Sequence, residues 1–266
     1  MAIFTFTSAS GSPGVTTTAL GLALVWPRPV LLVEADPTGG SALLAGYWRG
    51  QLDHVGLLDL VMAERHGVLA DALPRLQLAI DGTEAAVLVG TKSHDQAVSL
   101  ARLWDPLLGL LQSLPGQDAI VDAGRLGLTG SPQSLVTYSD VTLLVTHSSL
   151  RALAAARSWA ATLAADVVPG HDAQIVLVGE GRKYRAGDVA RTLGLKVAGS
   201  VEWDPRRAAV FSDGASYPVP RFGGESAAAR SFEQSGYVRS LRALAASLRP
   251  TVAADPLVDV PEESLA

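Results

Sequence analysis

The chain of 266 residues contains no cysteine, so it can form neither a disulfide bond nor a thiolate metal site. Its five histidines show no ligand spacing, which leaves oxygen atoms as the ligands for any metal. No apolar run reaches the roughly 20 residues that a membrane span needs, and no basic leader is present. We therefore expect a cytoplasmic protein.

Lysine is also scarce, since 18 of the 21 basic residues are arginine. The formal net charge of −5 argues against a generally basic nucleic-acid-binding protein, so DNA binding is not indicated.

Short apolar runs recur along the chain and alternate with helix-length segments. Near-continuous apolar runs are typical of strands covered on both faces of a parallel sheet. The predicted strands are residues 2–7, 29–34, 85–89, 118–122, 141–145, 174–178 and 196–201, and the clearest helices are 15–25, 96–114 and 149–164. This βα rhythm predicts an α/β fold with a doubly wound, mostly parallel sheet flanked by helices.

One pair of runs breaks this rhythm. Residues 76–80 and 84–89 are separated by Asp81, Gly82 and Thr83, which predicts an antiparallel hairpin at the sheet edge. Near the end, a loop over 212–224 precedes an expected last helix at 227–248. We expect one domain over residues 1–250 and a flexible acidic tail over 251–266.

The most informative loop lies between the first predicted strand and the first predicted helix. Gly11 and Gly14 let backbone N–H groups turn toward an anion, and the helix N-terminus adds a favourable dipole. A nucleotide phosphate is therefore expected beside Gly11, Ser12, Pro13, Gly14, Val15, Thr16 and Thr17. The hydroxyl of Thr16 or Thr17 would bind Mg²⁺. Many strand-to-helix turns use glycine only to turn, and that simpler reading stays open.

Acidic residues end two of the predicted strands. Glu34 and Asp36 follow one strand and Asp122 ends another, at the sheet edge where open α/β folds bind ligands. With Thr16, Asp36 and Asp122 form the expected Mg²⁺ site. Taken singly, Asp36 is also a plausible helix N-cap and Asp122 a turn residue.

Together these segments resemble the MinD/ParA family of P-loop ATPases over residues 1–248. The matching segments are 10–18 for the phosphate loop, 30–37 for switch I, 118–122 for the Walker B strand, 138–145 for the next strand and 201–205 for the segment beside the base. The resemblance implies a P-loop NTPase-like fold, ATP and Mg²⁺ as cofactors, a catalytic role for Asp36, and base contacts at Asp204 and Pro205. It also implies a homodimer that serves as the protein partner of a larger machine.

The departures from the family pattern concern catalysis. Ser10 and Val15 stand where the family has its signature lysine and its phosphate-loop lysine. Loss of both cations predicts very slow or absent hydrolysis, because electrostatic stabilisation dominates phosphoryl transfer. Arg125, just after Asp122, is the candidate compensating cation, and an ordinary surface role for it stays open.

We therefore expect a pseudo-ATPase with a degenerate Walker A loop, serving as a localisation or scaffold protein. The pilus-associated atypical relatives are the most similar precedent. The alternative is an active positioning ATPase that switches between monomer and dimer. No catalytic lysine or additional substrate motif points to amidoligase chemistry. The arginine-flanked apolar stripe of the last helix fits peripheral membrane contact, but packing on the sheet is the favoured interpretation.

Overall fold

A computed structural model of the protein describes residues 1–54, 56–166, 168–219 and 224–248. The expected acidic tail at 251–266 lies outside the described residues. The strands are β1 (Ile3–Ser8), β2 (Val30–Glu34), β3 (Leu78–Ala79), β4 (Ala85–Leu88), β5 (Asp118–Arg125), β6 (Val141–His147), β7 (Asp172–Val178) and β8 (Lys196–Val201). The helices are α1 (Val15–Leu24), α2 (Leu57–Arg65), α3 (Leu69–Leu76), α4 (Ala97–Leu100), α5 (Trp104–Leu111), α6 (Gln133–Tyr138), α7 (Leu150–Ala165), α8 (Ala186–Leu193), α9 (Pro205–Ser212), α10 (Glu225–Glu233) and α11 (Gly236–Leu248), with a π-helical turn η1 (Leu43–Tyr47) and a 3₁₀ turn η2 (His94–Gln96).

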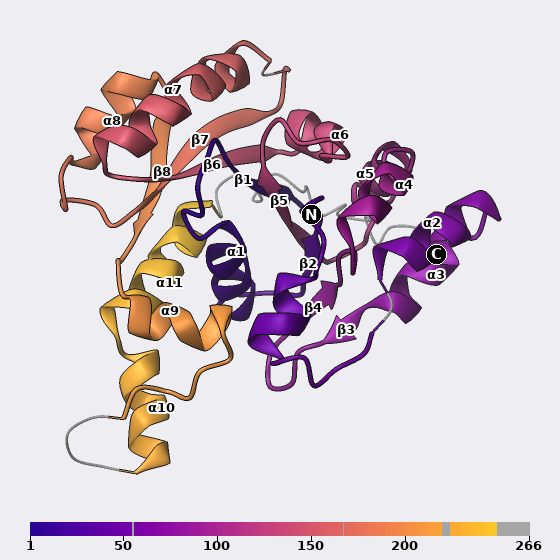
Figure 1. The fold of residues 1–266 in the computed structure, drawn as a ribbon, viewed down its shortest axis with the longest axis horizontal. Helices are drawn as coiled ribbons and strands as arrows, with labels where there is room; N and C mark the ends of the chain where they lie inside the picture. The colour runs from indigo at the N-terminus through magenta and orange to yellow at the C-terminus, as the bar shows by residue number, and fades with distance from the viewer. Residues whose placement is uncertain (55, 167, 220–223, 249–266) are drawn as a thin grey trace, which may run out of the picture.

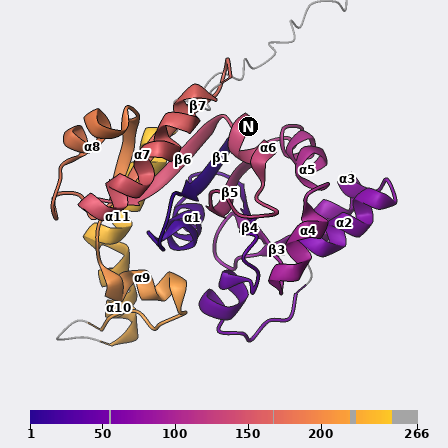
Figure 2. The ribbon, with the colours of Figure 1, turned by 45° about the horizontal axis from the view of Figure 1, so that its top comes forward.

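The strands form one eight-stranded sheet in the order β3-β4-β2-β5-β1-β6-β7-β8. Neighbouring strands are parallel except β3 and β4, which pair antiparallel. The predicted doubly wound, mostly parallel sheet with an antiparallel edge hairpin is therefore confirmed. Figures 1 and 2 show α2 and α3 near the β3 edge and α8 near the β8 edge, at opposite sides of the molecule.

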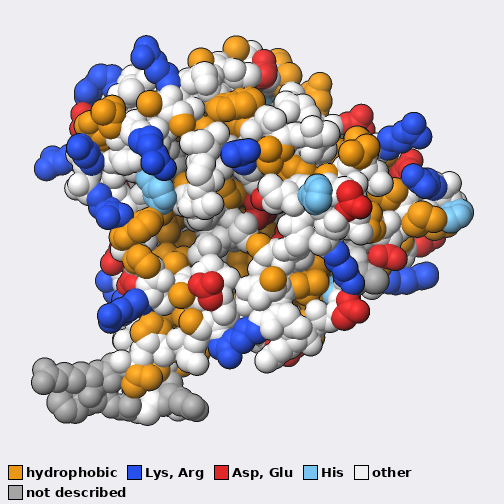
Figure 3. All heavy atoms as spheres, viewed as in Figure 1, with side chains coloured by type: hydrophobic (Ala, Val, Ile, Leu, Met, Phe, Trp, Pro, Cys, Tyr) orange, Lys and Arg blue, Asp and Glu red, His pale blue; other side chains and the backbone are white. Residues whose placement is uncertain are grey.

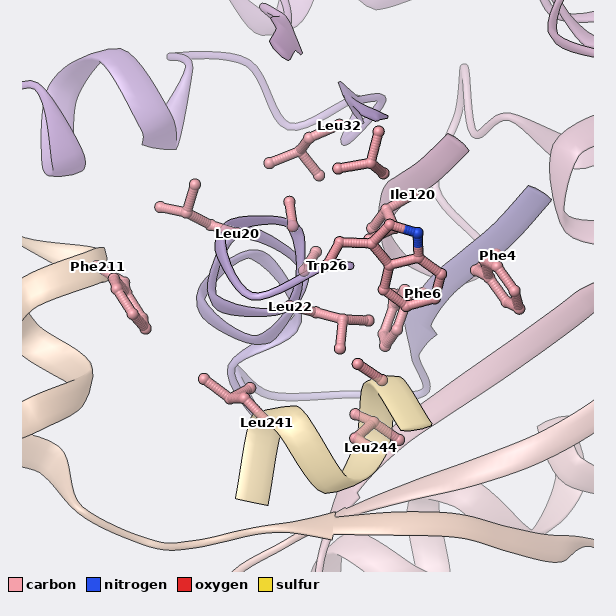
Figure 4. Packing of buried hydrophobic residues seen from close by; sticks show 14 of the residues in the cluster. Phe4, Phe6, Leu20, Leu22, Trp26, Leu32, Ile120, Phe211, Leu241 and Leu244 are labelled. Atoms are coloured by element: carbon pink, nitrogen blue, oxygen red, sulfur yellow. The ribbon is translucent and has the colours of Figure 1, made fainter. Parts of the chain in front are cut away.

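Helices cover both faces of the sheet and enclose two apolar cores. One core joins α1, α9 and α11, and the other joins α2, α5, α7 and α8. Figure 4 shows Leu20 and Leu22 of α1 among Phe211 of α9 and Leu241 and Leu244 of α11. The first core therefore fixes the helix that follows the glycine loop, which also fixes the direction in which its N-terminus points.

The final helical region differs from the single helix expected over 227–248. It forms two helices, α10 and α11, because the chain breaks at Gln234 and Ser235, where the Ser235 hydroxyl accepts from Val238 N at 3.2 Å. The apolar stripe of α11 is buried in the core, whereas Arg239 and Arg242 are exposed. The favoured interpretation, a helix packed on the sheet, agrees with this placement.

The helix expected over 96–114 is likewise divided, into η2, α4 and α5. Within the described residues, no helix combines the length and apolar character required to cross a membrane. On the face seen in Figure 3, several lysine and arginine side chains lie together at the upper left, on the side of α7 and α8, and others are scattered along the right and lower edges.

Candidate functional site

The glycine loop connects the central strand β1 to α1. Gly11 and Gly14 adopt φ values of 69° and 91°, a left-handed backbone region that favours glycine. Helix α1 begins at Val15, and Thr18 N donates to Gly14 O at 2.9 Å. The first N–H groups of a helix have no partner within it. The loop therefore offers backbone donors and a helix N-terminus to an anion, as the sequence predicts.

Val15 lies in the apolar core rather than in the loop cavity. Its side chain is 7% exposed and packs with the cluster that contains Phe4, Phe6 and Leu20. Ser10, by contrast, is exposed. Neither position therefore supplies a positive charge to the loop, and the side chain at position 15 has a packing role.

A cleft of about 310 Å³ opens beside the loop. Six of the nine predicted nucleotide-binding residues line it: Ser12, Pro13, Gly14, Thr17, Asp204 and Pro205. Gly11 is exposed and Thr16 lines a neighbouring cavity. No lysine or arginine is among the described residues that line the cleft. The structure thus brings the loop and the segment at 201–205 to one cavity, although they are far apart in sequence.

Part of the cleft wall is aromatic, a feature that the sequence motifs do not reveal. Trp203 and His147 make an edge-to-face contact with ring centroids 5.0 Å apart, and both line the cleft. The guanidinium carbon of Arg182 lies 4.4 Å from the Trp203 ring centroid, a cation–π contact. Asp204 itself caps α9, accepting from Arg207 N at 3.1 Å and pairing with the Arg207 guanidinium. An aromatic ring beside the cleft suits contact with a planar ligand group.

The acidic residues lie at the carboxyl ends of β2 and β5. Parallel pairing sets Glu34 opposite Asp122. Glu34 is buried and accepts from Ser41 Oγ at 2.5 Å, Leu43 N at 3.0 Å and Gly90 N at 2.9 Å. Burial raises the pKa of Glu34, while these donors lower it. Glu34 therefore fixes the loop after β2 to the end of β4.

Asp122 is 1% exposed, and burial raises its pKa to about 7. Gly124 N donates to its Oδ1 at 3.0 Å. The nearby Thr16 hydroxyl and this Gly124 N–H both lower the pKa of Asp122, yet Oδ2 itself has no hydrogen-bond partner. The negative charges of Asp36 and Glu34 raise the pKa further. A buried carboxylate oxygen without a donor fits the outer coordination shell of a bound cation.

Asp36 is held closely against the backbone of Gly124. Asp36 Oδ1 accepts from Thr38 N at 2.8 Å, and a Cβ added at Gly124 would lie 2.3 Å from Asp36 Cγ. Gly124 has a φ of 61°. Arg125 follows at the end of β5 with an exposed side chain that makes no ion pair within the described part of the chain.

A second, small cavity of about 30 Å³ lies between α1 and the ends of β2 and β4. Thr16, Asp36 and Thr91 are among the residues that line it. Thr91 is 2% exposed and its hydroxyl has no hydrogen-bond partner. No sequence pattern singles out Thr91, because a threonine after a strand is common. Within the described ranges, no three or more histidine, aspartate or glutamate side chains are grouped so that they could hold a metal ion.

Comparison of the fold with solved structures defines its class, the fold of MinD and ParA P-loop ATPases. The cell division ATPase MinD of Pyrococcus furiosus matches with a TM-score of 0.69 and 18% identity, over 94% of this chain and 98% of that one. The septum site-determining protein MinD of Pyrococcus horikoshii, complexed with Mg-ADP, gives a TM-score of 0.68 and 17% identity, over 95% and 97%.

A putative plasmid partition protein of Borrelia burgdorferi bound to AMPPNP gives a TM-score of 0.62 and 12% identity, over 94% of this chain and 98% of that one. No family model and no curated protein sequence matches the chain. At these identities the comparisons establish the shared fold.

Proposed function

We propose that this protein binds a magnesium nucleotide and hydrolyses it weakly or not at all, serving as a localisation or scaffold protein. The observation that carries the proposal is the placement of Val15. The loop keeps its backbone donors, whereas the side chain at the phosphate-loop lysine position is 7% exposed and packs in the core.

Nucleotide binding is supported by the geometry of the cleft. Loop residues and the segment with Asp204 and Pro205 line one cavity, and the aromatic wall at Trp203 suits a base. The similar Pyrococcus horikoshii and Borrelia burgdorferi proteins are complexed with Mg-ADP and AMPPNP. Thr16, Asp36 and Asp122 would hold Mg²⁺, whose charge would partly neutralise the phosphates.

Weak hydrolysis follows from the missing cations. A missing arginine finger lowers phosphoryl-transfer rates by on the order of a thousandfold or more, and here two lysines are replaced, at Ser10 and Val15. Arg125 is the remaining candidate cation next to the acidic end of the sheet. Asp36 would still orient an attacking water, but with little stabilisation of the developing charge.

The role in the cell would then rest on binding rather than on turnover. We propose a cytoplasmic homodimer that docks on a protein of a larger machine, such as a pilus, secretion, division or partition apparatus. A related precedent is the Aquifex aeolicus MinC:MinD cell division protein complex, whose fold is similar. Peripheral membrane contact through α11 is not favoured, because its apolar stripe is buried in the core.

Calorimetry with ATP, ADP and GTP in the presence of Mg²⁺ tests nucleotide binding. The matched control is Gly14→Asp, which places a carboxylate in the loop at a backbone φ of 91°. We expect the natural protein to bind ATP and the variant, checked for folding by circular dichroism, to bind at least tenfold more weakly. Equal binding by the two proteins, or none by either, would contradict the proposal.

The alternative function is an active positioning ATPase that switches between monomer and dimer. Its support is the retained set Gly14, Thr16, Asp36 and Asp122 at the expected places. Light scattering during incubation with a limited amount of ATP separates the two. A dimer that persists supports the scaffold function, whereas a dimer that returns to monomer as phosphate is released supports the switching ATPase.

A further inference from the structure

The outer surface of α7 and α8 carries an uneven share of the positive charge of the chain. Residues 150–165 and 181–196 hold seven of the 21 lysine and arginine residues and one acidic residue, Asp188, in a chain whose formal net charge is −5. Figure 3 shows basic side chains together at the upper left, on the side where Figure 1 places α7 and α8. The seven basic residues are all exposed and are called the basic face below: Arg151, Arg157, Arg182, Lys183, Arg185, Arg191 and Lys196.

The packing of α7 and α8 brings these residues to one edge of the sheet. Helix α7 contacts α8, and α8 contacts β8, the last strand. On α7, Trp159 lies beside Gly127 and lines a cavity with residues of α6. Arg157 is two positions earlier, about 200° around the helix, so it projects on the side of α8. The basic face therefore extends from α7 over α8 to the start of β8.

Most of the charge on the basic face is not neutralised by neighbouring side chains. Arg191 forms an ion pair with Asp188 at 3.3 Å, and Arg182 lies over an aromatic ring. Glu180 lies near Arg185, but it already accepts hydrogen bonds from a serine hydroxyl and a backbone N–H. Five cations make no ion pair in the part of the chain that the structure describes, and such a surface attracts an anionic partner. They are Arg151, Arg157, Lys183, Arg185 and Lys196.

The chain itself contains an anionic segment that starts at the same edge of the sheet. Residues 251–266, which lie outside the described part of the structure, contain no basic residue and four acidic ones: Asp255, Asp259, Glu262 and Glu263. The described chain ends at Leu248 of α11, and α11 packs on β8 from the face opposite α8. Because β8 is the last strand of the described sheet, no other strand lies between the end of α11 and α8.

The length of this segment is sufficient for it to reach α8. A helix with its side chains is about 10–12 Å across, so passing from a helix on one face of β8 to a helix on the other requires roughly 20–25 Å. Residues 249–255 span up to about 23–25 Å when extended, at about 3.3–3.6 Å per residue. The carboxylate of Asp255 can therefore reach the near side of the basic face, and the three later carboxylates can reach farther along it.

The covalent connection favours this segment over other anions. Exposed ion pairs are individually weak, and salt screens them. A segment joined to its binding surface by a short linker, however, has an effective concentration in the millimolar range. A short acidic segment also meets only the basic face, whereas a long polyanion such as DNA also meets the acidic remainder of the chain.

We propose that residues 251–266 dock on the basic face of the same chain and cover it. The docked segment excludes other anionic partners from α7 and α8, and high salt or a competing polyanion displaces it. This interaction does not depend on nucleotide binding, so it stands or fails separately from the proposed function.

The scarcity of lysine makes zero-length crosslinking a specific test. A carbodiimide joins a carboxylate to an amine only where the two are in contact, and of the three lysines in the chain Lys183 and Lys196 belong to the basic face. Lys92 forms an ion pair with Asp53 and serves as the internal positive control. With the full chain at low ionic strength, we expect mass spectrometry to find amides between the acidic segment and Lys183 or Lys196. Their yield should fall at least about fivefold in about 0.5 M NaCl.

Charge reversal separates docking from chance collision. Arg157→Glu combined with Arg185→Glu keeps both lysines of the basic face and reverses two of its charges. The matched control is Arg65→Glu with Arg75→Glu, because these arginines are exposed on α2 and α3, near the opposite edge of the sheet, and change the net charge equally. Circular dichroism checks that both double variants are folded. Amides to the lysines of the basic face should fall at least about fivefold in the first variant and stay within about twofold of the natural protein in the second.

Absence of amides between the acidic segment and either lysine, in a sample where Lys92 and Asp53 are joined, would overturn the inference and leave the basic face to another anionic partner. Equal yields in the two double variants would also overturn it, because chance contact does not depend on the charge of the face. A mixture of isotope-labelled and unlabelled chains identifies whose segment is bound. Amides formed only between chains would assign the face to a second copy and contradict docking within one chain.

Discussion

The close approach of Gly124 to Asp36 gives the sharpest test of the acidic end of the site. In Gly124→Ala the new Cβ would lie 2.3 Å from Asp36 Cγ, at a backbone φ of 61°. The left-handed backbone contributes about 1–2 kcal/mol of destabilisation, and the clash about 1–3 kcal/mol more. At about 2–4 °C per kcal/mol for a chain of this size, the melting temperature should fall by roughly 4–20 °C.

Gly116→Ala is the matched control, since Gly116 has a φ of 70° and an added Cβ would meet nothing within 4 Å. It should lower the melting temperature by the backbone contribution alone, roughly 2–8 °C. In an Asp36→Ala background, the loss of melting temperature caused by Gly124→Ala should shrink to that of the control, because the clashing carboxylate is gone. Thermal denaturation by circular dichroism compares the natural protein with the three single variants and the double variant. An equal effect of Gly124→Ala in both backgrounds would refute the proposed contact.

Three further predictions concern charge, the loop and a strained turn. Burial raises the pKa of Asp122 to about 7, so the folded protein holds a proton that the unfolded chain releases near pH 4. The free energy of unfolding should therefore fall as pH rises from about 4 to 7, by at most about 1.4 kcal/mol per pH unit. Asp122→Asn should flatten this slope in denaturant titrations. Val15→Lys should lower the melting temperature of the free protein, because Val15 is buried. The new ammonium group should also tighten ATP binding about tenfold in calorimetry by pairing with the phosphates. Unchanged affinity would count against phosphate binding by the loop. Arg49 has a φ of 54° and its guanidinium donates to Gly214 O. Both Arg49→Ala and Arg49→Gly lose this hydrogen bond, but only glycine relieves the left-handed backbone, so Arg49→Ala should lower the free energy of unfolding by about 1 kcal/mol more. The opposite order would contradict backbone strain at Arg49.

The sequence predicts the inner strands of the sheet well because they are mostly buried on both faces, which makes them short apolar runs that stand out from their surroundings. The hairpin at Asp81, Gly82 and Thr83 was predictable for a local reason, since the turn residues lie between two such runs. The region between β2 and β3 was not, because α2 and α3 mix exposed and buried residues without a strong end signal. The break at Ser235 likewise depends on a hydroxyl cap that helical spacing does not reveal.

The candidate site was predictable where residue type and strand position coincide, as for Gly14, Asp36 and Asp122. It was not predictable where tertiary packing decides. Trp203 and His147 meet only because β6 and the segment after β8 lie at the same end of the sheet. Thr91 became a candidate only through the cavity that it lines and the partner that its hydroxyl lacks.

Phosphate release from ATP under saturating Mg²⁺, compared between the natural protein and folded Gly14→Asp, tests the central claim most directly. With Val15 buried and Ser10 in place of lysine, we predict that the two rates are the same within error. Mg²⁺-dependent turnover by the natural protein well above that of the loop-blocked variant would contradict the claim and make the switching ATPase the better description.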